Sequence, residues 1–216
     1  FHRLGKASEG ENLTDRMFTD GRSSLNLILK RMGANEHLWL RTERSVTLIA
    51  STASYVLTPK PMRILSVRRR LTASLIDTPI AQLSRQEYYD LPTKTTPATV
   101  PVSWYFDPQL STGTLYVWPA PSTAVATAQT LELTYLRKIE DMTATSNDLD
   151  MPQEWLDAII CLLADDLETE YPVNDARLAK KIESRAAQSL LALEAFDTEL
   201  SNIYIEPEAD YYADAV

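Results

Sequence analysis

The spacing of apolar residues divides this chain into helical ends and a strand-rich middle. Near the N-terminus apolar residues recur at intervals of three and four, which predicts a helix from about residue 12 to residue 32. Asn12 is a suitable N-cap for this helix, and Gly33 has the backbone freedom that favours a helix end. Lys30 and Arg31 would lie in the last turn, where positive charge is favourable.

Two further helices are predicted in the last third of the chain. The first runs from Glu154 to about Glu170, after the start signal Asp150-Met151-Pro152-Gln153, with Asp150 as the N-cap. Tyr171-Pro172 ends this helix, because a proline disfavours helical backbone in the residue before it. The second runs from Asn174 to about Phe196, and the short connection predicts an antiparallel helical hairpin.

The segment between these helical ends reads as short strands. β-branched and aromatic residues are frequent there, and most of the prolines of the chain punctuate it. Ser84 and Glu87 match a capping box, so one or two helical turns are expected from Ser84 to Asp90. The expected strands are Leu38–Leu40, Arg44–Ala50 with Ser54–Leu57 as its hairpin partner, Met62–Leu71, Ser103–Asp107, Thr114–Trp118 and Thr130–Arg137.

Together these elements predict an α+β fold. Its core is a helical bundle made of the N-terminal helix and the C-terminal helical hairpin, into which a small antiparallel β-sandwich or barrel-like module is inserted. We expect residues 1–36 and 139–199 to form one discontinuous helical domain, and residues 37–138 to form the β-rich insertion. Residues 200–216 are expected to be an extended C-terminal arm.

The charge of the chain is distributed unevenly. The net charge is −9, but residues 1–137 carry 16 Lys and Arg against 11 Asp and Glu, whereas residues 138–216 carry 5 against 19. The acidic half argues against a surface that grips DNA, because Lys and Arg supply the affinity for phosphates. The longest apolar run, Ala158–Ala164, is too short to span a bilayer, so no membrane is expected as a partner.

No motif in the sequence indicates catalysis or a cofactor. One cysteine and two histidines exclude an internal disulfide and make a multi-histidine metal site improbable. Asp148 and Asp150 lack the glycine and closing glutamate of a calcium loop. We therefore expect no enzyme activity, no metal and no cofactor. The acids Asp165, Asp166, Glu168 and Glu170 are interpreted as a solvated or channel-lining helix surface rather than as acid–base catalysts.

Arg68, Arg69 and Arg70 form the most basic run in the chain. They fit contacts with phosphate or with the acidic surface of a neighbouring subunit or other partner, and the sequence leaves both readings open. Because side chains alternate along a strand, at most two of the three share a face. The many aromatic residues of the β-rich segment are expected mainly in its core rather than on a stacking surface.

The C-terminal end is a candidate binding arm. From Glu194 to Val216 it has seven acids and no base, and too little apolar area to fold alone. Its strand-like and aromatic residues are typical of anchors that dock on a neighbour, for example by strand addition; a disordered acidic tail is the alternative. The candidate anchors are Ile203, Tyr204, Ile205, Pro207, Tyr211 and Tyr212.

A series of short sequence words resembles one family. Leu83–Pro92 reads LSRQEYYDLP, Trp104–Gln109 reads WYFDPQ and Leu115–Pro121 reads LYVWPAP. In this order they are similar to the head-to-tail adaptor proteins of short-tailed bacteriophages. Further similarities lie in Tyr55–Arg70, Leu133–Met142, Asp150–Trp155 and Glu199–Pro207, whereas the N-terminus and the residues after Pro207 depart from the family pattern.

This resemblance implies a structural protein of the virion. Family members form a dodecameric ring below the portal protein, extend its channel and hold a tail or nozzle protein. The ring retains packaged DNA until ejection, and double-stranded DNA passes through it without specific binding. The resemblance places the protein at the head-tail junction, and in the host cytoplasm during assembly. The alternatives are a virion-associated cell-wall hydrolase and a nucleic-acid-binding module that uses Arg68–Arg70.

Overall fold

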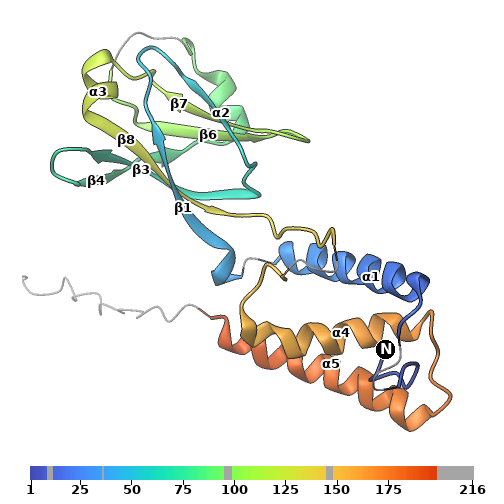
Figure 1. Ribbon diagram of the computed structural model, residues 1–216. Helices are drawn as coiled ribbons and strands as arrows, with labels where there is room; N and C mark the ends of the chain where they lie inside the picture. The colour runs from blue at the N-terminus through green and yellow to red at the C-terminus, as the bar shows by residue number, and fades with distance from the viewer. Residues whose placement is uncertain (9–11, 36, 95–98, 145–147, 199–216) are drawn as a thin grey trace, which may run out of the picture.

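The computed structural model describes residues 1–8, 12–35, 37–94, 99–144 and 148–198. Figure 1 shows two modules, one built from long helices and the other from β-sheets, joined where the first and the last long strand leave the β module. The predicted α+β class is confirmed, with two small sheets in the described residues and no closed barrel. No helix in the described part is both long and apolar enough to cross a bilayer.

The first helix, α1, spans Asp15–Gly33. Thr14 is its N-cap, with a side-chain oxygen that accepts a hydrogen bond from the Met17 backbone N–H, so the predicted start at Asn12 is two residues too early. Gly33 lies inside the helix, and Ala34 is the C-cap. The buried face of α1, with Leu25, Ile28, Leu29 and Met32 among its residues, is the apolar stripe seen in the sequence.

The C-terminal hairpin is formed by α4 (Leu156–Glu168) and α5 (Ala176–Phe196). A short 3-10 helix, η2 (Gln153–Trp155), precedes α4 and has Pro152 as its N-cap, so the prediction that Asp150 caps this helix is wrong. Asp175 caps α5 by accepting a hydrogen bond from the Arg177 backbone N–H. In Figure 1 the two helices run side by side in opposite directions, and α1 lies beside α4.

The β module consists of two four-stranded sheets. The first sheet has the order β1 (Arg41–Thr47), β8 (Gln129–Leu136), β3 (Arg63–Leu71) and β4 (Asp77–Pro79). The second sheet has the order β2 (Ser54–Leu57), β7 (Gly113–Trp118), β6 (Ser103–Pro108) and β5 (Ala81–Gln82), and β5 is parallel to β6.

Two predictions about these strands are wrong. The segments expected to form a hairpin, β1 and β2, lie in different sheets: β1 pairs with β8, and β2 pairs with β7. Leu38–Leu40 is a 3-10 helix, η1, instead of a strand. The predicted capping box is confirmed at α2 (Arg85–Asp90), where Ser84 and Glu87 bond each other's backbone. A second short helix, α3 (Thr123–Ala128), leads into β8.

Each module has its own apolar core, and β8 contributes to both. Leu131 and Leu133 of β8 are buried between the two sheets together with Trp104. Leu136, at the end of the same strand, is buried against α1, η2 and α4 in a cluster that includes Trp155. Each fully buried leucine contributes about 1.5–3 kcal/mol. The modules therefore share one apolar cluster at the joint, in addition to the chain segments that link them.

Candidate interaction surfaces

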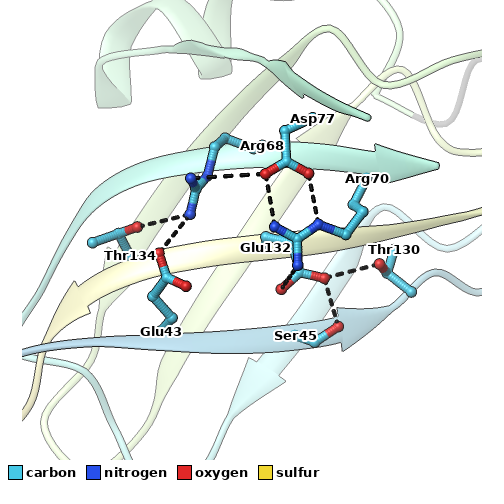
Figure 2. A network of polar contacts seen from close by, with 8 residues as sticks. All are labelled: Glu43, Ser45, Arg68, Arg70, Asp77, Thr130, Glu132 and Thr134. Carbon is cyan, nitrogen blue, oxygen red and sulfur yellow. Dashed lines mark hydrogen bonds and ion pairs between the residues drawn. The ribbon is translucent and has the colours of Figure 1, made fainter. Parts of the chain in front are cut away.

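Arg68 and Arg70 lie on the outer face of the first sheet, and both are paired inside the fold (Figure 2). Arg70 grips Asp77 with two hydrogen bonds, from Nε to Oδ1 at 2.6 Å and from Nη2 to Oδ2 at 2.7 Å. Arg68 donates to Glu43 at 2.8 Å and lies 3.8 Å from Asp77. Since Arg70 stabilises its ionised form, the pKa of Asp77 lies below its ordinary value.

Glu132 completes this network from the middle of the sheet. Its side chain is about 10% exposed, and Oε1 accepts hydrogen bonds from Ser45 at 2.9 Å and Thr130 at 3.0 Å. Arg70 approaches its other oxygen to 3.7 Å. The network in Figure 2 thus joins β1, β8, β3 and β4. Three carboxylates around two arginines leave little free positive charge for a phosphate group.

Arg69 points to the opposite face of β3, as the alternation along a strand requires. Its guanidinium donates to the Gln129 side-chain oxygen at 3.2 Å, and its Nε is buried without a hydrogen-bond partner in the described residues. Burial lowers the pKa of Arg69. The three consecutive arginines therefore do not form one patch.

The four acids of the α4 region divide into two groups. Asp165 and Asp166 are half-buried and line a hollow of about 250 Å³ with residues of α1 and α5. Asp166 lies 3.5 Å from Arg31 of α1. Burial, and then repulsion from Glu183 and Asp166, raises the pKa of Asp165. Glu168 and Glu170 do not line this hollow. Only two of the four acids that were predicted to share a helix surface therefore lie together there.

Aromatic residues lie on both faces of the second sheet. Trp104 and Phe106 belong to the core between the sheets, but four tyrosines cluster on the outer face, so the expectation of a mainly core location is only partly met. Trp104 is 2% exposed, and Tyr88 of α2 packs against Tyr105 and Tyr116 on the outer face of the second sheet, with ring centroids 5.3 and 5.1 Å away. Tyr89 is half exposed. Within the described residues no group of three or more potential metal ligands is gathered.

Asp150 makes the first of two sets of polar contacts, here called ties, at the joint between the modules. Its carboxylate pairs with Arg137, just after β8, and accepts a hydrogen bond from the Glu140 backbone N–H at 3.1 Å. Arg137 also lies over the ring of Trp39, 5.7 Å from its centroid. The ion pair with Arg137 holds the pKa of Asp150 below its ordinary range. Asp150, predicted as a helix cap, instead fastens the connection between β8 and α4.

The second tie at the joint was not predicted. Asp197, the C-cap of α5, accepts hydrogen bonds from the Leu38 backbone N–H at 3.2 Å and lies 2.8 Å from His37 Nδ1. His37 is 6% exposed and packs edge-on against Trp155, with ring centroids 4.6 Å apart. The end of the last described helix is therefore fixed to the start of the β module.

The predicted arm anchors Ile203, Tyr204, Ile205, Pro207, Tyr211 and Tyr212 lie outside the described residues. What the structure does define is the point from which the arm leaves, because Asp197 and Thr198 are described. That point lies next to Leu38, three residues before the first residue of β1.

In this structure many charged groups connect elements of the fold to one another. Comparison with protein families gives a match to the SU10 adaptor protein family over residues 8–213. The chain belongs to this family, and the resemblance to head-to-tail adaptors inferred from its sequence is confirmed.

Two other comparisons complete this result. Among solved structures, a chain described as "Neck of empty GTA particle computed with C6 symmetry" matches with 12% identity over 85% of both chains, at a TM-score of 0.30. This likeness is too low to support any argument about function. A search of curated proteins gives no significant match.

Proposed function

We propose that this protein forms a ring that joins the portal of a phage head to the tail. The observation that carries the proposal is the adaptor-family match, which includes nearly all described residues and reaches into the arm. In this role the ring extends the DNA channel, retains packaged DNA until ejection and holds a tail protein on its far side. A dodecamer is the stoichiometry that the family resemblance implies.

The distribution of charge supports a ring of identical subunits. Residues 37–138 carry 11 Lys and Arg against 6 Asp and Glu, while residues 139–216 carry 4 against 19. Identical copies of net charge −9 repel one another unless opposite charges meet at their interfaces. A head-to-tail contact between the basic β module of one copy and the acidic helical module of the next satisfies this requirement and closes into a ring.

We further propose that the arm after Glu199 is the part that binds the portal or an adjacent copy, through Ile203, Tyr204, Ile205, Pro207, Tyr211 and Tyr212. Its composition, rich in anchors and poor in core-forming residues, motivates this role. Asp165, Asp166, Glu168 and Glu170 are proposed to face the channel, where negative charge keeps DNA from adhering.

The test is to assemble portal-bearing heads with the full chain and with a chain that lacks residues 200–216. We expect the full chain to give a ring on the portal in negative-stain images, and the shortened chain to give none. Circular dichroism of the shortened chain provides the control for folding. Normal attachment of the shortened chain contradicts the proposed role of the arm, and failure of the full chain to bind contradicts the adaptor function itself.

The nucleic-acid-binding alternative makes a different prediction. If Arg68–Arg70 gripped phosphate, the affinity for DNA would fall steeply with salt, with a slope set by the number of phosphates contacted. Because Arg68 and Arg70 are already paired with Glu43, Asp77 and Glu132, we expect only weak DNA binding in a salt titration.

A further inference from the structure

One long strand edge in the described part of the molecule is open. β1 pairs with β8 on one side, and no described strand pairs with its other side. The hydrogen bond from Arg137 N–H to Leu40 C=O, 2.9 Å long, sets the alternation of this antiparallel pair. It follows that Thr42, Arg44 and Val46 turn their backbone groups towards β8, whereas the backbone groups of Glu43, Ser45 and Thr47 face outwards.

The open edge is accessible. Glu43, Ser45 and Thr47 are all exposed residues of β1. At Glu43, Ser45 and Thr47 the outward N–H and C=O groups have no partner among the described residues. Such an edge is a template for another strand, and proteins usually cover it or shorten it. The edge at the other end of this sheet, β4, is only three residues long. The length of β1 therefore calls for a partner that the described residues do not supply.

The C-terminal arm starts beside this edge. The carboxylate of Asp197 lies 3.2 Å from the backbone nitrogen of Leu38, and β1 begins at Arg41. In Figure 1 the end of α5 lies beneath the lower end of β1. β1 follows Leu38 after the 3-10 turn η1, so an extended arm that starts at Asp197 comes level with β1 within its first few residues.

We propose that the segment Asn202–Pro207 adds to β1 of its own chain as a parallel edge strand. This inference deepens the proposed role of the arm and rests on it. Ile203 and Ile205 point to one face of such a strand and Tyr204 to the other. On the core side, the two isoleucines extend the apolar layer to which the half-buried Val46 belongs. Pro207 ends the pairing, since proline has no N–H to donate.

Charge and tethering both favour this occupant. The arm from Glu199 to Val216 has five acids and no base, and the β module is net basic. A linker of a few residues gives the arm an effective concentration of roughly millimolar at its own edge. A second copy at micromolar concentration competes poorly with this, so in the free subunit the arm pairs with its own β1.

The proposal gives the arm two exclusive states. A segment paired with β1 cannot bind the portal at the same time, so attachment exchanges one strand pairing for another. Before attachment, the covered edge protects the free subunit from pairing with other chains.

The test is hydrogen–deuterium exchange resolved to single amides, on the free full chain and on the same chain that lacks residues 200–216. We expect the Glu43, Ser45 and Thr47 amides that point outwards to exchange at least about tenfold more slowly in the full chain. The Leu133 amide in β8 is the internal control and should exchange equally in both chains. Exchange at β1 that is equal in the two chains overturns the proposal.

Proline variants test the pairing without removing the arm. The double change Ile203→Pro and Tyr204→Pro should abolish the protection of β1, because prolines cannot donate to a ladder, whereas Ala213→Pro should leave it intact. Protection that rises with protein concentration, together with a larger mass in light scattering, also overturns the proposal, since the strand then comes from another copy.

The outcome is separable from that of the attachment experiment. If the shortened chain fails to attach to heads but β1 exchanges as in the full chain, the arm binds the portal and does not pair with β1. If the protection of β1 is lost on shortening but attachment is normal, the strand pairing stands and the proposed portal-binding role of the arm falls.

Discussion

Two conspicuous runs of charge in this sequence have opposite electrostatic surroundings in the fold. The arginines of β3 meet carboxylates from other strands, so that Arg70 and Asp77 stabilise each other and the pKa of Asp77 lies low. Among the acids of α4, Asp166 meets Arg31, but Asp165 meets other acids, and the pKa of Asp165 lies high because burial and Glu183 disfavour its charge. A run of charge in a sequence therefore does not reveal whether the fold has already neutralised it.

The difference reflects which side chains the neighbouring elements supply. In a sheet, residues directly across on neighbouring strands come close together, so an arginine finds partners that are distant in sequence. Asp165 of α4 also faces a residue of a neighbouring element, Glu183 of α5, but this residue carries the same charge. The sheet network is internal structure, whereas the unbalanced acids of the helical module remain available to influence what lies outside it.

The largest predicted effect tests whether the β module, which contains the arginine network, and the helical module, which contains the acids, unfold together. Trp155 is 3% exposed in the core that β8 shares with the helices, and Trp155→Ala should cost about 3–5 kcal/mol of unfolding free energy. We expect circular dichroism to show a single urea transition in both proteins, with the midpoint of the whole transition lowered in the variant. The exposed Leu191→Ala is the control, with a change of about 0.5 kcal/mol or less. A β module that keeps its own midpoint contradicts the shared core.

A smaller effect is expected from removing the centre of the arginine network. Glu132→Ala leaves Ser45 and Thr130 without their acceptor and removes one of the two carboxylates beside Arg70. It should cost about 1–3 kcal/mol in urea unfolding. Glu140→Ala, which removes an exposed glutamate near the joint, should change stability by only about 0.5 kcal/mol. Equal losses in the two variants mean that the network of Figure 2 does not stabilise the sheet.

The tie made by Asp150 should appear as a dependence of stability on pH. Pairing with Arg137 lowers the pKa of Asp150 in the folded chain. Its contribution, about 1 kcal/mol, is therefore present above the unfolded-state pKa of about 3.9 and is lost as the pH falls through the folded-state value. In urea unfolding from pH 7 down to pH 2.5, Asp150→Asn should be less stable than the parent chain at neutral pH and should converge with it at low pH. A constant gap excludes ionisation of Asp150 as the cause.

The smallest predicted effect has the opposite sign. Because the pKa of Asp165 is raised in the folded chain, its ionisation costs stability at neutral pH, and this cost disappears as the pH falls through the folded-state pKa. Asp165→Asn should therefore gain about 0.5 kcal/mol in thermal or urea unfolding at pH 7. Glu168→Gln on the same helix is the matched control and should gain less. A destabilised Asp165→Asn protein shows that a favourable contact holds this carboxylate.

Local signals in the sequence predicted the parts of the fold that depend on neighbouring residues. The capping box of Ser84 and Glu87 is a contact over three positions, and it forms as expected. The apolar stripe of α1 was correct, although its cap was misplaced because Asn12 and Thr14 have similar capping chemistry. The class of the fold followed from these local periodicities.

Contacts between distant segments were not predictable in the same way. Strand pairing in a sandwich is decided by the whole sheet, so the adjacency of β1 and β2 in sequence suggested a hairpin that does not exist. The contact between His37 and Asp197 joins residues 160 positions apart, and no pattern links them. Likewise, only the register of β3 with β8 and β4 shows that Arg68 and Arg70 face carboxylates.

The position of β1 and β8 has a mechanical consequence. Both strands meet the helical module at the same end, β1 at Arg41 and β8 at Leu136, and they are paired with each other along their length. A force that pulls the two modules apart therefore enters the first sheet lengthwise through two adjacent strands. It loads the hydrogen bonds between β8 and β3 in shear, all at once, instead of opening them one by one. The joint therefore resists tension along the direction of these strands.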